Sequence, residues 1–387
     1  MKRRTFLAGA GALGAFAPDR VLAAFGDTPL MAQVNFACVV PLTGPNLRAG
    51  EALANGVRQA IDDANRLRGP LEKVYGFRTF DDQNLIAPGI LEAQFAVADS
   101  NMIGVIGHLS GKVTDQALPV YAAARMPLIV PASTYDRITA HHVGTVFRLP
   151  TRDSVEGRLS AKYLGSIPSM KKFVVLAQDG DYGNDVATGF RAQATADGLA
   201  AHIVLFSWEK PDYQAAAREA IASGPDMIYL AGNTADMGPV IPALQAAGYK
   251  GNLAASQGFF LLATIEKYGS AVEGIVVSSS MPPLYLAPSD YLIKRDFEAR
   301  YGPMTPLSTF GYAATQVLIG AVKRSGGFDR ASLARTIATS GPFDTAAGNF
   351  QFGYDGDPID PNLYFYTVKD AKWAYIKAAH PSAFLIK

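Results

Sequence analysis

Short apolar runs alternate with amphipathic helical patterns along most of the chain. An apolar run at 34–40 precedes a segment whose apolar residues recur every three or four positions from Leu53 to Leu67, which is typical of a helix with one buried face. A second run at 74–80 precedes a helical pattern over 88–98. Repeated strand–helix units predict an α/β fold, in which parallel sheets are flanked by helices and joined by right-handed crossovers.

The stretch 102–135 contains the pair of strand ends on which our functional hypothesis depends. Apolar runs at 103–106 and 127–130 predict two strands with a helix between them, and each strand ends in a loop of small polar residues. The carboxyl ends of parallel strands open onto one crevice. Accessible backbone N–H groups at a helix start favour an anion there. The residues expected to line this crevice are Ser110, Gly111, Ala132, Ser133 and Thr134.

Several segments in a fixed order resemble a known family. VIGHL at 105–109 and PLIVPAST at 127–134 are similar to segments of the leucine/isoleucine/valine-binding family of periplasmic solute-binding proteins. PLTGPNLRAG at 41–50, DGDYGNDVATGF at 179–190 and DMIYLAGNTADMG at 226–238 follow in the family's order. The resemblance implies a two-lobed type I periplasmic binding fold and, as partner, the membrane permease of an ABC importer.

The pattern of strands and helices restarts after Pro150, which suggests a second α/β lobe. With the resemblance, we expect 24–149 plus 279–349 to form lobe one and 150–278 plus 350–387 to form lobe two. The chain would then cross between lobes three times. The final apolar runs, 363–368 and 373–377, predict a hairpin.

The resemblance also implies roles for individual residues. The loops at Ser110–Gly111 and 132–134 would hold a ligand carboxylate from lobe one, and Tyr182 would contact the ligand from lobe two. Asn233 stands where the family often has tyrosine. Gln257 stands where amino-acid binders have the glutamate that pairs with the ligand ammonium. Alternatively, Tyr182 packs on its own lobe and Gln257 is a solvated loop residue.

The glutamine at 257 leads to a hypothesis about the ligand. A buried ammonium without a counter-charge is costly, so we expect a small organic acid that lacks one, such as an aromatic carboxylate or a 2-oxo acid. A branched-chain or other amino acid is the alternative, in which another acid such as Asp181 or Asp236 replaces the glutamate. Four aromatic residues fall in or near segments expected to face the cleft: Phe259, Phe260, Tyr285 and Phe310.

Residues 1–23 have the plan of an export signal rather than of folded structure. Basic residues at 2–4 precede an apolar run at 6–17, and Val21-Leu22-Ala23 suits signal peptidase. Arg3-Arg4 favours the twin-arginine pathway, with an ordinary Sec signal as the alternative. We therefore expect a soluble periplasmic protein without a lipid anchor. Cys38 is the only cysteine and cannot form an intramolecular disulfide.

Other function classes find less support in the sequence. The formal net charge of the whole sequence is +1, and the expected signal contributes +3 of it, so the mature chain would carry +1 − 3 = −2. A near-neutral mature chain without basic runs argues against nucleic acid or an anionic membrane as partner. The serine in 107–111 is not central between glycines, as a nucleophile elbow requires. His141-His142 has too few neighbouring donors for zinc. We expect no enzyme activity, no cofactor or metal, and a monomer. A sensor with the same fold and, less favoured, a hydrolase are the alternatives.

Overall fold

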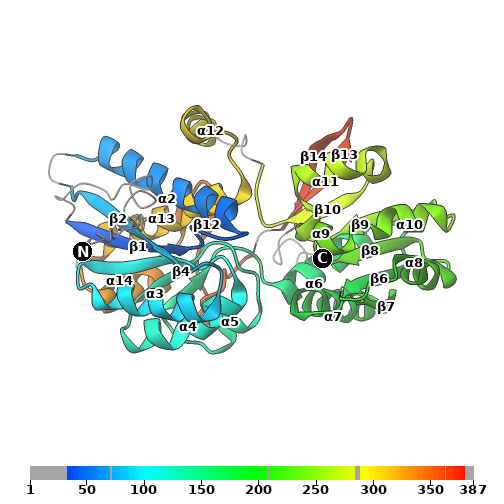
Figure 1. Ribbon diagram of the computed structural model, residues 1–387, viewed down its shortest axis with the longest axis horizontal. Coiled ribbons are helices and arrows are strands. Elements are labelled where there is room, and N and C mark those ends of the chain that lie inside the picture. Colours follow the sequence, from blue (N-terminus) through cyan, green and yellow to red (C-terminus); the bar gives the residue numbers. More distant parts are fainter. Residues whose placement is uncertain are drawn as a thin grey trace, which may run out of the picture.

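Two α/β bodies lie side by side, each built on its own sheet (Figure 1). The computed structural model describes residues 33–379, apart from 70, 71, 208, 284–287, 327 and 362. The expected export signal at 1–23 and Tyr285 lie outside the described residues. We call the body on the left of Figure 1 lobe one and the body on the right lobe two.

Lobe one contains a five-stranded sheet in which every pairing is parallel, in the order β2-β1-β3-β4-β5. Its strands are β1 (Val34–Val40), β2 (Tyr75–Asp81), β3 (Met102–Gly107), β4 (Leu128–Val130) and β5 (Val146–Arg148). All six residues of β3 are buried. Such continuous apolar strands are typical of a parallel sheet covered by helices on both faces.

Helices cover both faces of this sheet. One face carries α2 (Leu47–Leu67), α13 (Pro306–Ser325) and α14 (Arg330–Thr339), and the other carries α3 (Ile86–Ala98) and α4 (Gly111–Ala123). Glycine allows α2 and α13 to approach closely, because a Cβ at Gly56 would lie 2.0 Å from the Ser308 carbonyl oxygen. Three further elements are α5 (Arg137–Ala140), α12 (Pro288–Tyr301) and the hairpin β11 (Phe343–Thr345) with β12 (Gly348–Phe350).

Lobe two contains a seven-stranded sheet in the order β14-β13-β10-β9-β8-β6-β7. Five of its strands pair in parallel: β6 (Lys172–Gln178), β7 (Ala200–Phe206), β8 (Met227–Ala231), β9 (Asn252–Ala255) and β10 (Val276–Ser279). The antiparallel hairpin of β13 (Leu363–Lys369) and β14 (Lys372–Ala379) extends the sheet beyond β10. The predicted hairpin is therefore confirmed.

The helices of lobe two also pack on both faces of their sheet. One face carries α6 (Asp153–Gly165) and α7 (Asp181–Ala196). The other carries α8 (Tyr213–Ala222), α10 (Val240–Ala246) and α11 (Leu262–Tyr268). Three short elements complete the lobe: α9 (Thr234–Met237) and the 3₁₀ turns η2 (Gln257–Phe259) and η3 (Gly269–Val272).

The predicted fold class is confirmed, and the differences from the sequence prediction are local. The helical segment at 234–246 is divided into α9 and α10 at Gly238–Pro239, because proline has no N–H to continue a helix. The short strand β9 was not predicted. Phe350 and Phe352 pack in the core of lobe one, so the third crossing lies after Phe352 and not at residue 350, where we had placed it. With that change, the division into lobes stays our proposal.

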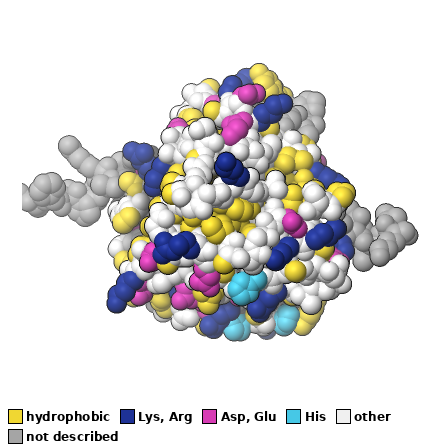
Figure 2. All heavy atoms as spheres, turned by 90° about the vertical axis from the view of Figure 1, so that its right-hand side faces the viewer, with side chains coloured by type: hydrophobic (Ala, Val, Ile, Leu, Met, Phe, Trp, Pro, Cys, Tyr) yellow, Lys and Arg dark blue, Asp and Glu magenta, His cyan; other side chains and the backbone are white. Residues whose placement is uncertain are grey.

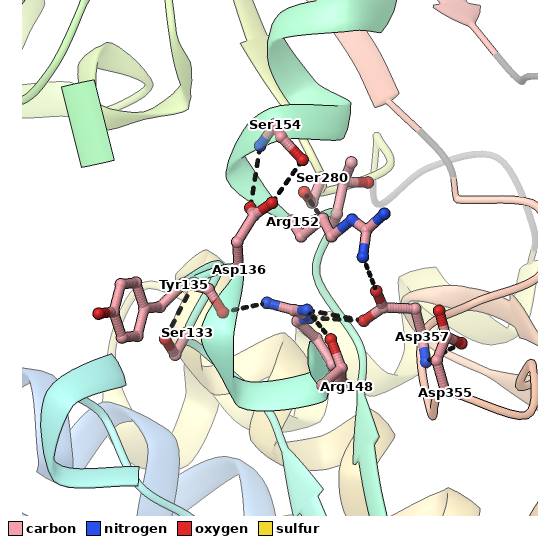
Figure 3. A network of polar contacts seen from close by, with 11 residues as sticks. Ser133, Tyr135, Asp136, Arg148, Arg152, Ser154, Ser280, Asp355 and Asp357 are labelled. Atoms are coloured by element: carbon pink, nitrogen blue, oxygen red, sulfur yellow. Dashed lines mark hydrogen bonds and ion pairs between the residues drawn. The ribbon is translucent and has the colours of Figure 1, made fainter. Parts of the chain in front are cut away.

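Polar contacts join the three crossings between the lobes (Figure 3). The Thr151 N–H in the first crossing donates to Ser280 Oγ in the second over 3.0 Å. Asp357 in the third crossing accepts from Arg152 over 3.2 Å and from the buried Arg148 over 2.8 Å. The connections that would serve as a hinge therefore form one hydrogen-bonded unit.

None of the helices in the described part of the chain is long and apolar enough to cross a membrane. On the face of lobe two shown in Figure 2, lysine and arginine side chains are scattered among acidic and polar ones. Among the described residues drawn there, the basic side chains form no continuous surface of the kind that binds nucleic acid.

Candidate functional site

A cavity of about 760 Å³ lies between the lobes, and its walls come from strand ends of both sheets. All eight residues that the sequence singled out line it: Ser110, Gly111, Ala132, Ser133, Thr134, Tyr182, Asn233 and Gln257. Each follows the carboxyl end of a parallel strand, where α/β sheets open their crevices. The structure thus brings the predicted site residues together.

The lobe-one wall is made by the loops after β3 and β4. Gly111 begins α4, and a Cβ there would lie 2.5 Å from Tyr135 Cβ and 2.6 Å from Ser133 Oγ. Only glycine lets these two loops meet at this distance. Ser133 Oγ accepts from the Tyr135 N–H over 3.3 Å, which leaves its hydroxyl proton available to a ligand.

A buried histidine supports the first of these loops. His108 is fully buried, and its ring nitrogens contact Asp82 Oδ2 at 2.7 Å and the Tyr121 hydroxyl at 3.0 Å. The other oxygen of Asp82 accepts from the Asn84 N–H, and Asp81 accepts from the N–H groups of Leu42 and Gln83. Both aspartates thus accept backbone hydrogen bonds in the turn that follows β2. His108 orients the loop that carries Ser110.

On the lobe-two wall, Gln257 is turned inward, and both ends of its amide are hydrogen-bonded within the protein. Its Nε2 donates to Glu156 Oε2 over 2.8 Å, and its backbone N–H donates to Glu156 Oε1 over 2.6 Å. Its Oε1 accepts from the backbone N–H of Ser280 over 3.3 Å and from the Ser280 hydroxyl over 3.1 Å. Gln257 is therefore not a solvated loop residue, and its amide oxygen has no lone pair left for a ligand.

Glu156 lies beneath the cavity and was missed by the sequence analysis. It is fully buried and also accepts from the Ser278 hydroxyl over 2.7 Å. Burial raises the pKa of the Glu156 carboxyl, and the hydrogen bonds from Ser278 and Gln257 oppose that rise. The Tyr182 hydroxyl approaches the same carboxylate at 3.5 Å and accepts from the Gly258 N–H at 3.1 Å. Tyr182 is thereby fixed at the cavity wall.

A second acid that the sequence analysis missed, Asp153, lines the cavity itself. It is only 1% exposed, and its Oδ1 has no hydrogen-bond partner among the described residues. Burial is the main cause that raises its pKa well above the ordinary aspartate value. Asp153, Glu156 and Ser160 recur at helical spacing on the buried face of α6. Polar residues at positions that should be apolar are the sequence signal that could have revealed both acids.

The two acids named as replacements for the missing glutamate differ in position. Asp181 lines the cavity and pairs with Lys112 of lobe one at 3.2 Å, on an exposed part of its wall. Asp236 accepts from Gln178 Nε2 over 2.7 Å and is not among the lining residues. Of the aromatic candidates, Phe260 and Phe310 line the cavity, whereas Phe259 is fully buried in the core of lobe two.

The fold and the cavity define a two-lobed solute-binding protein of the type I periplasmic class, and comparisons with known proteins agree. A family model described as periplasmic binding protein matches residues 33–372, so the chain belongs to that family. A Leu/Ile/Val-binding protein homolog 1 from Brucella suis biovar 1 is 26% identical over 358 residues, which cover 92% of this chain and 96% of the homolog. The resemblance inferred from the sequence motifs is thus confirmed.

Two solved structures show the same fold. The leucine-binding protein of Thermotoga maritima MSB8 superposes with a TM-score of 0.79 at 23% identity, covering 90% of this chain and 99% of that one. A solute-binding protein of an ABC transporter from R. palustris, solved in complex with benzoate, superposes with a TM-score of 0.74 at 21% identity. That alignment covers 90% of this chain and 96% of the other.

Proposed function

We propose that this chain is the exported substrate-binding protein of an ABC importer and captures a small carboxylate-bearing solute between its lobes. Within that class we favour an aromatic acid or a 2-oxo acid over an amino acid. The volume of about 760 Å³ suits a small organic molecule. The protein would act without enzyme activity, as a monomer, and would deliver the solute to a membrane permease.

The observation that carries the ligand preference is the saturated amide oxygen of Gln257, which already accepts two hydrogen bonds. Both amide groups are engaged within the protein, by Glu156 on one side and by Ser280 on the other. Gln257 therefore offers an ammonium neither a charge nor a free acceptor. A hydrogen bond to a charged group contributes about 1.5 to 3 kcal/mol, so an α-amino acid should bind roughly 10- to 100-fold more weakly than it would with glutamate there.

The carboxylate has suitable partners on lobe one. The first turn of α4 begins at Gly111 beside the cavity, and free N–H groups of a helix start favour an anion. The Ser133 and Thr134 hydroxyls lie at the same wall. Phe260 and Phe310 provide apolar surface for the rest of the ligand. The benzoate complex of the R. palustris protein supports a carboxylate without an ammonium as a possible ligand of this fold.

A branched-chain amino acid is the second candidate. The names of the Brucella and Thermotoga relatives support it, and Asp181 lies at the cavity wall. Asp181 is however already paired with Lys112 and about half exposed, so its charge would stabilise an ammonium less than a buried carboxylate.

A thermal-shift panel tests the proposed ligand class. Benzoate, phenylpropenoate and 4-methyl-2-oxopentanoate should raise the melting temperature more than leucine or valine at the same concentration. Ligand at 100 times its dissociation constant adds about 2.7 kcal/mol to the free energy of unfolding. Ser133→Ala should reduce the shift, whereas Ser223→Ala, at the end of α8 far from the lining residues, should not. A shift with leucine and none with the acids would overturn the preference.

Export is tested separately. Periplasmic protein should begin at Ala24 or Phe25, as N-terminal sequencing would show. Active protein that retains Met1 in the cytoplasm would contradict the proposed location. A neighbouring gene for a permease or ATPase would distinguish a transport receptor from a sensor with the same fold.

A further inference from the structure

A second cavity, of about 490 Å³, lies between α6 of lobe two and the third crossing. Its walls come from α6 and the residue before it, from one residue of α7 and from the segment 353–361. No described residue lines both this cavity and the one between the lobes, although Arg152 of the first and Asp153 of the second are neighbours in the chain. A volume of this order suits a small organic molecule.

Positive charge gathers on the α6 wall of this second cavity. Arg152, Arg158 and Lys162 line it. Lys162 pairs with Asp197 at 2.8 Å, and Arg152 pairs with Asp357 of the third crossing at 3.2 Å (Figure 3). Arg158 is half-buried and forms no ion pair with any described residue. The cavity wall therefore carries one guanidinium whose charge no contact neutralises.

The surroundings of Arg158 favour an added anion. Burial and the neighbouring Arg152 lower the pKa of its guanidinium, while Asp136 raises it. Asp136 is itself engaged, because its two oxygens accept from the N–H and the hydroxyl of Ser154. Arg152 Nε is buried without a hydrogen-bond partner among the described residues. The two guanidiniums thus have more donors than acceptors, and a carboxylate is the group whose geometry matches a guanidinium fork.

The other walls decide the shape and the charge of an occupant. Val155, Leu159 and Ile359 give the cavity an apolar surface. Ile359 is 59% exposed, so an apolar group that packs on it removes that surface from water and is stabilised. Asp355 and Asp357 line the side of the third crossing, where they repel an anion with several charges. The chemistry that fits is a single carboxylate on an aliphatic chain.

We propose that this cavity is a second binding site, for an aliphatic monocarboxylate whose carboxylate pairs with Arg158 and whose chain packs on Leu159 and Ile359. Its occupant holds α6 of lobe two against the third crossing. The inference does not depend on which solute binds between the lobes.

Calorimetric titration with octanoate at pH 7 tests this inference. The wild-type protein should bind octanoate, and octan-1-ol should bind at least about tenfold more weakly, because the alcohol brings no charge to Arg158. Arg158→Gln should weaken octanoate binding by about tenfold or more for the same reason. Arg218→Gln removes the same charge from an exposed position of α8, on the opposite face of the lobe-two sheet, and should bind as the wild type does.

Ile359 provides a second route, because its exposed side chain can be replaced without opening the core. Ile359→Glu should weaken octanoate binding by repulsion, and Ile359→Lys, which removes the same apolar surface, should bind more tightly than Ile359→Glu. No binding by the wild type, or equal binding by the wild type and Arg158→Gln, would overturn the second site and leave the proposed function intact. Loss of binding in Ser133→Ala without an effect of Arg158→Gln would place octanoate between the lobes, which overturns the second site and supports the proposed function.

Discussion

Gln257 donates two hydrogen bonds to Glu156, one from its backbone N–H over 2.6 Å and one from Nε2 over 2.8 Å. The carboxylate of this pair is fully buried beneath the cavity, and the neutral amide lies at the wall. The negative charge on this side of the site is therefore directed toward the protein's own N–H and O–H groups. A ligand meets an amide whose oxygen already accepts two hydrogen bonds and whose nitrogen already donates one to Glu156.

Gln257→Glu should destabilise the protein, because it places a second carboxylate against Glu156. The expected loss is about 3 kcal/mol at pH 7, the order of an uncompensated buried charge. The double variant Glu156→Gln/Gln257→Glu exchanges the two groups and should recover most of the loss. Urea unfolding of the wild type, both single variants and the double variant gives the coupling energy. Additive losses would show that the pair does not interact as described.

Asp357→Asn should be strongly destabilising because it leaves the Arg148 guanidinium buried without its counter-charge. Arg148 is fully buried and pairs with Asp357 at 2.8 Å. Breaking a buried pair by removing one partner costs about 3 to 5 kcal/mol. Asp344→Asn, on an exposed position of β11, is the matched control and should change the free energy of unfolding by less than 0.5 kcal/mol. Equal effects of the two variants would contradict the structural role of Asp357.

Asp185 should make stability decrease with pH in the acid range. Burial, together with repulsion by Asp136 and Asp181, raises its pKa to about 6, above the unfolded value of about 3.9. The folded state therefore binds the proton more tightly, and its contribution is full below about pH 4 and is lost as the pH rises through about 6. Asp185→Asn should raise the melting temperature at pH 7 but not at pH 4. A constant difference between the two would contradict the assignment.

Much of the fold could be predicted from the sequence, because continuous apolar strands and one-sided helices both leave clear patterns. The lobe-one loops at 110–111 and 132–134 were also predictable, because loops of small polar residues at the carboxyl ends of parallel strands are typical of a binding crevice. Asp153 and Glu156 were not predicted, because their role depends on burial by segments distant in sequence. Gln257 is bonded to Glu156, 101 residues away in the chain. The direction of its amide could not be read from the residue itself.

Lobe closure should accompany binding if the cavity walls come together around the solute. The three crossings between the lobes are hydrogen-bonded to one another, so only a few residues can act as the hinge. A ligand that contacts both cavity walls favours the closed state. Small-angle scattering should give a smaller radius of gyration with saturating 4-methyl-2-oxopentanoate than without it. An unchanged radius with full occupancy would remove closure from the mechanism while leaving the binding site.

The most direct test of the central claim compares two ligands with one carbon skeleton. Leucine and 4-methyl-2-oxopentanoate share the carboxylate and the branched chain and differ in the ammonium and the carbonyl. Calorimetric titration of the wild-type protein at pH 6 should give a dissociation constant at least tenfold lower for the 2-oxo acid, because Gln257 leaves the ammonium without a counter-charge. Tighter binding of leucine would contradict the claim and identify an amino acid as the ligand class.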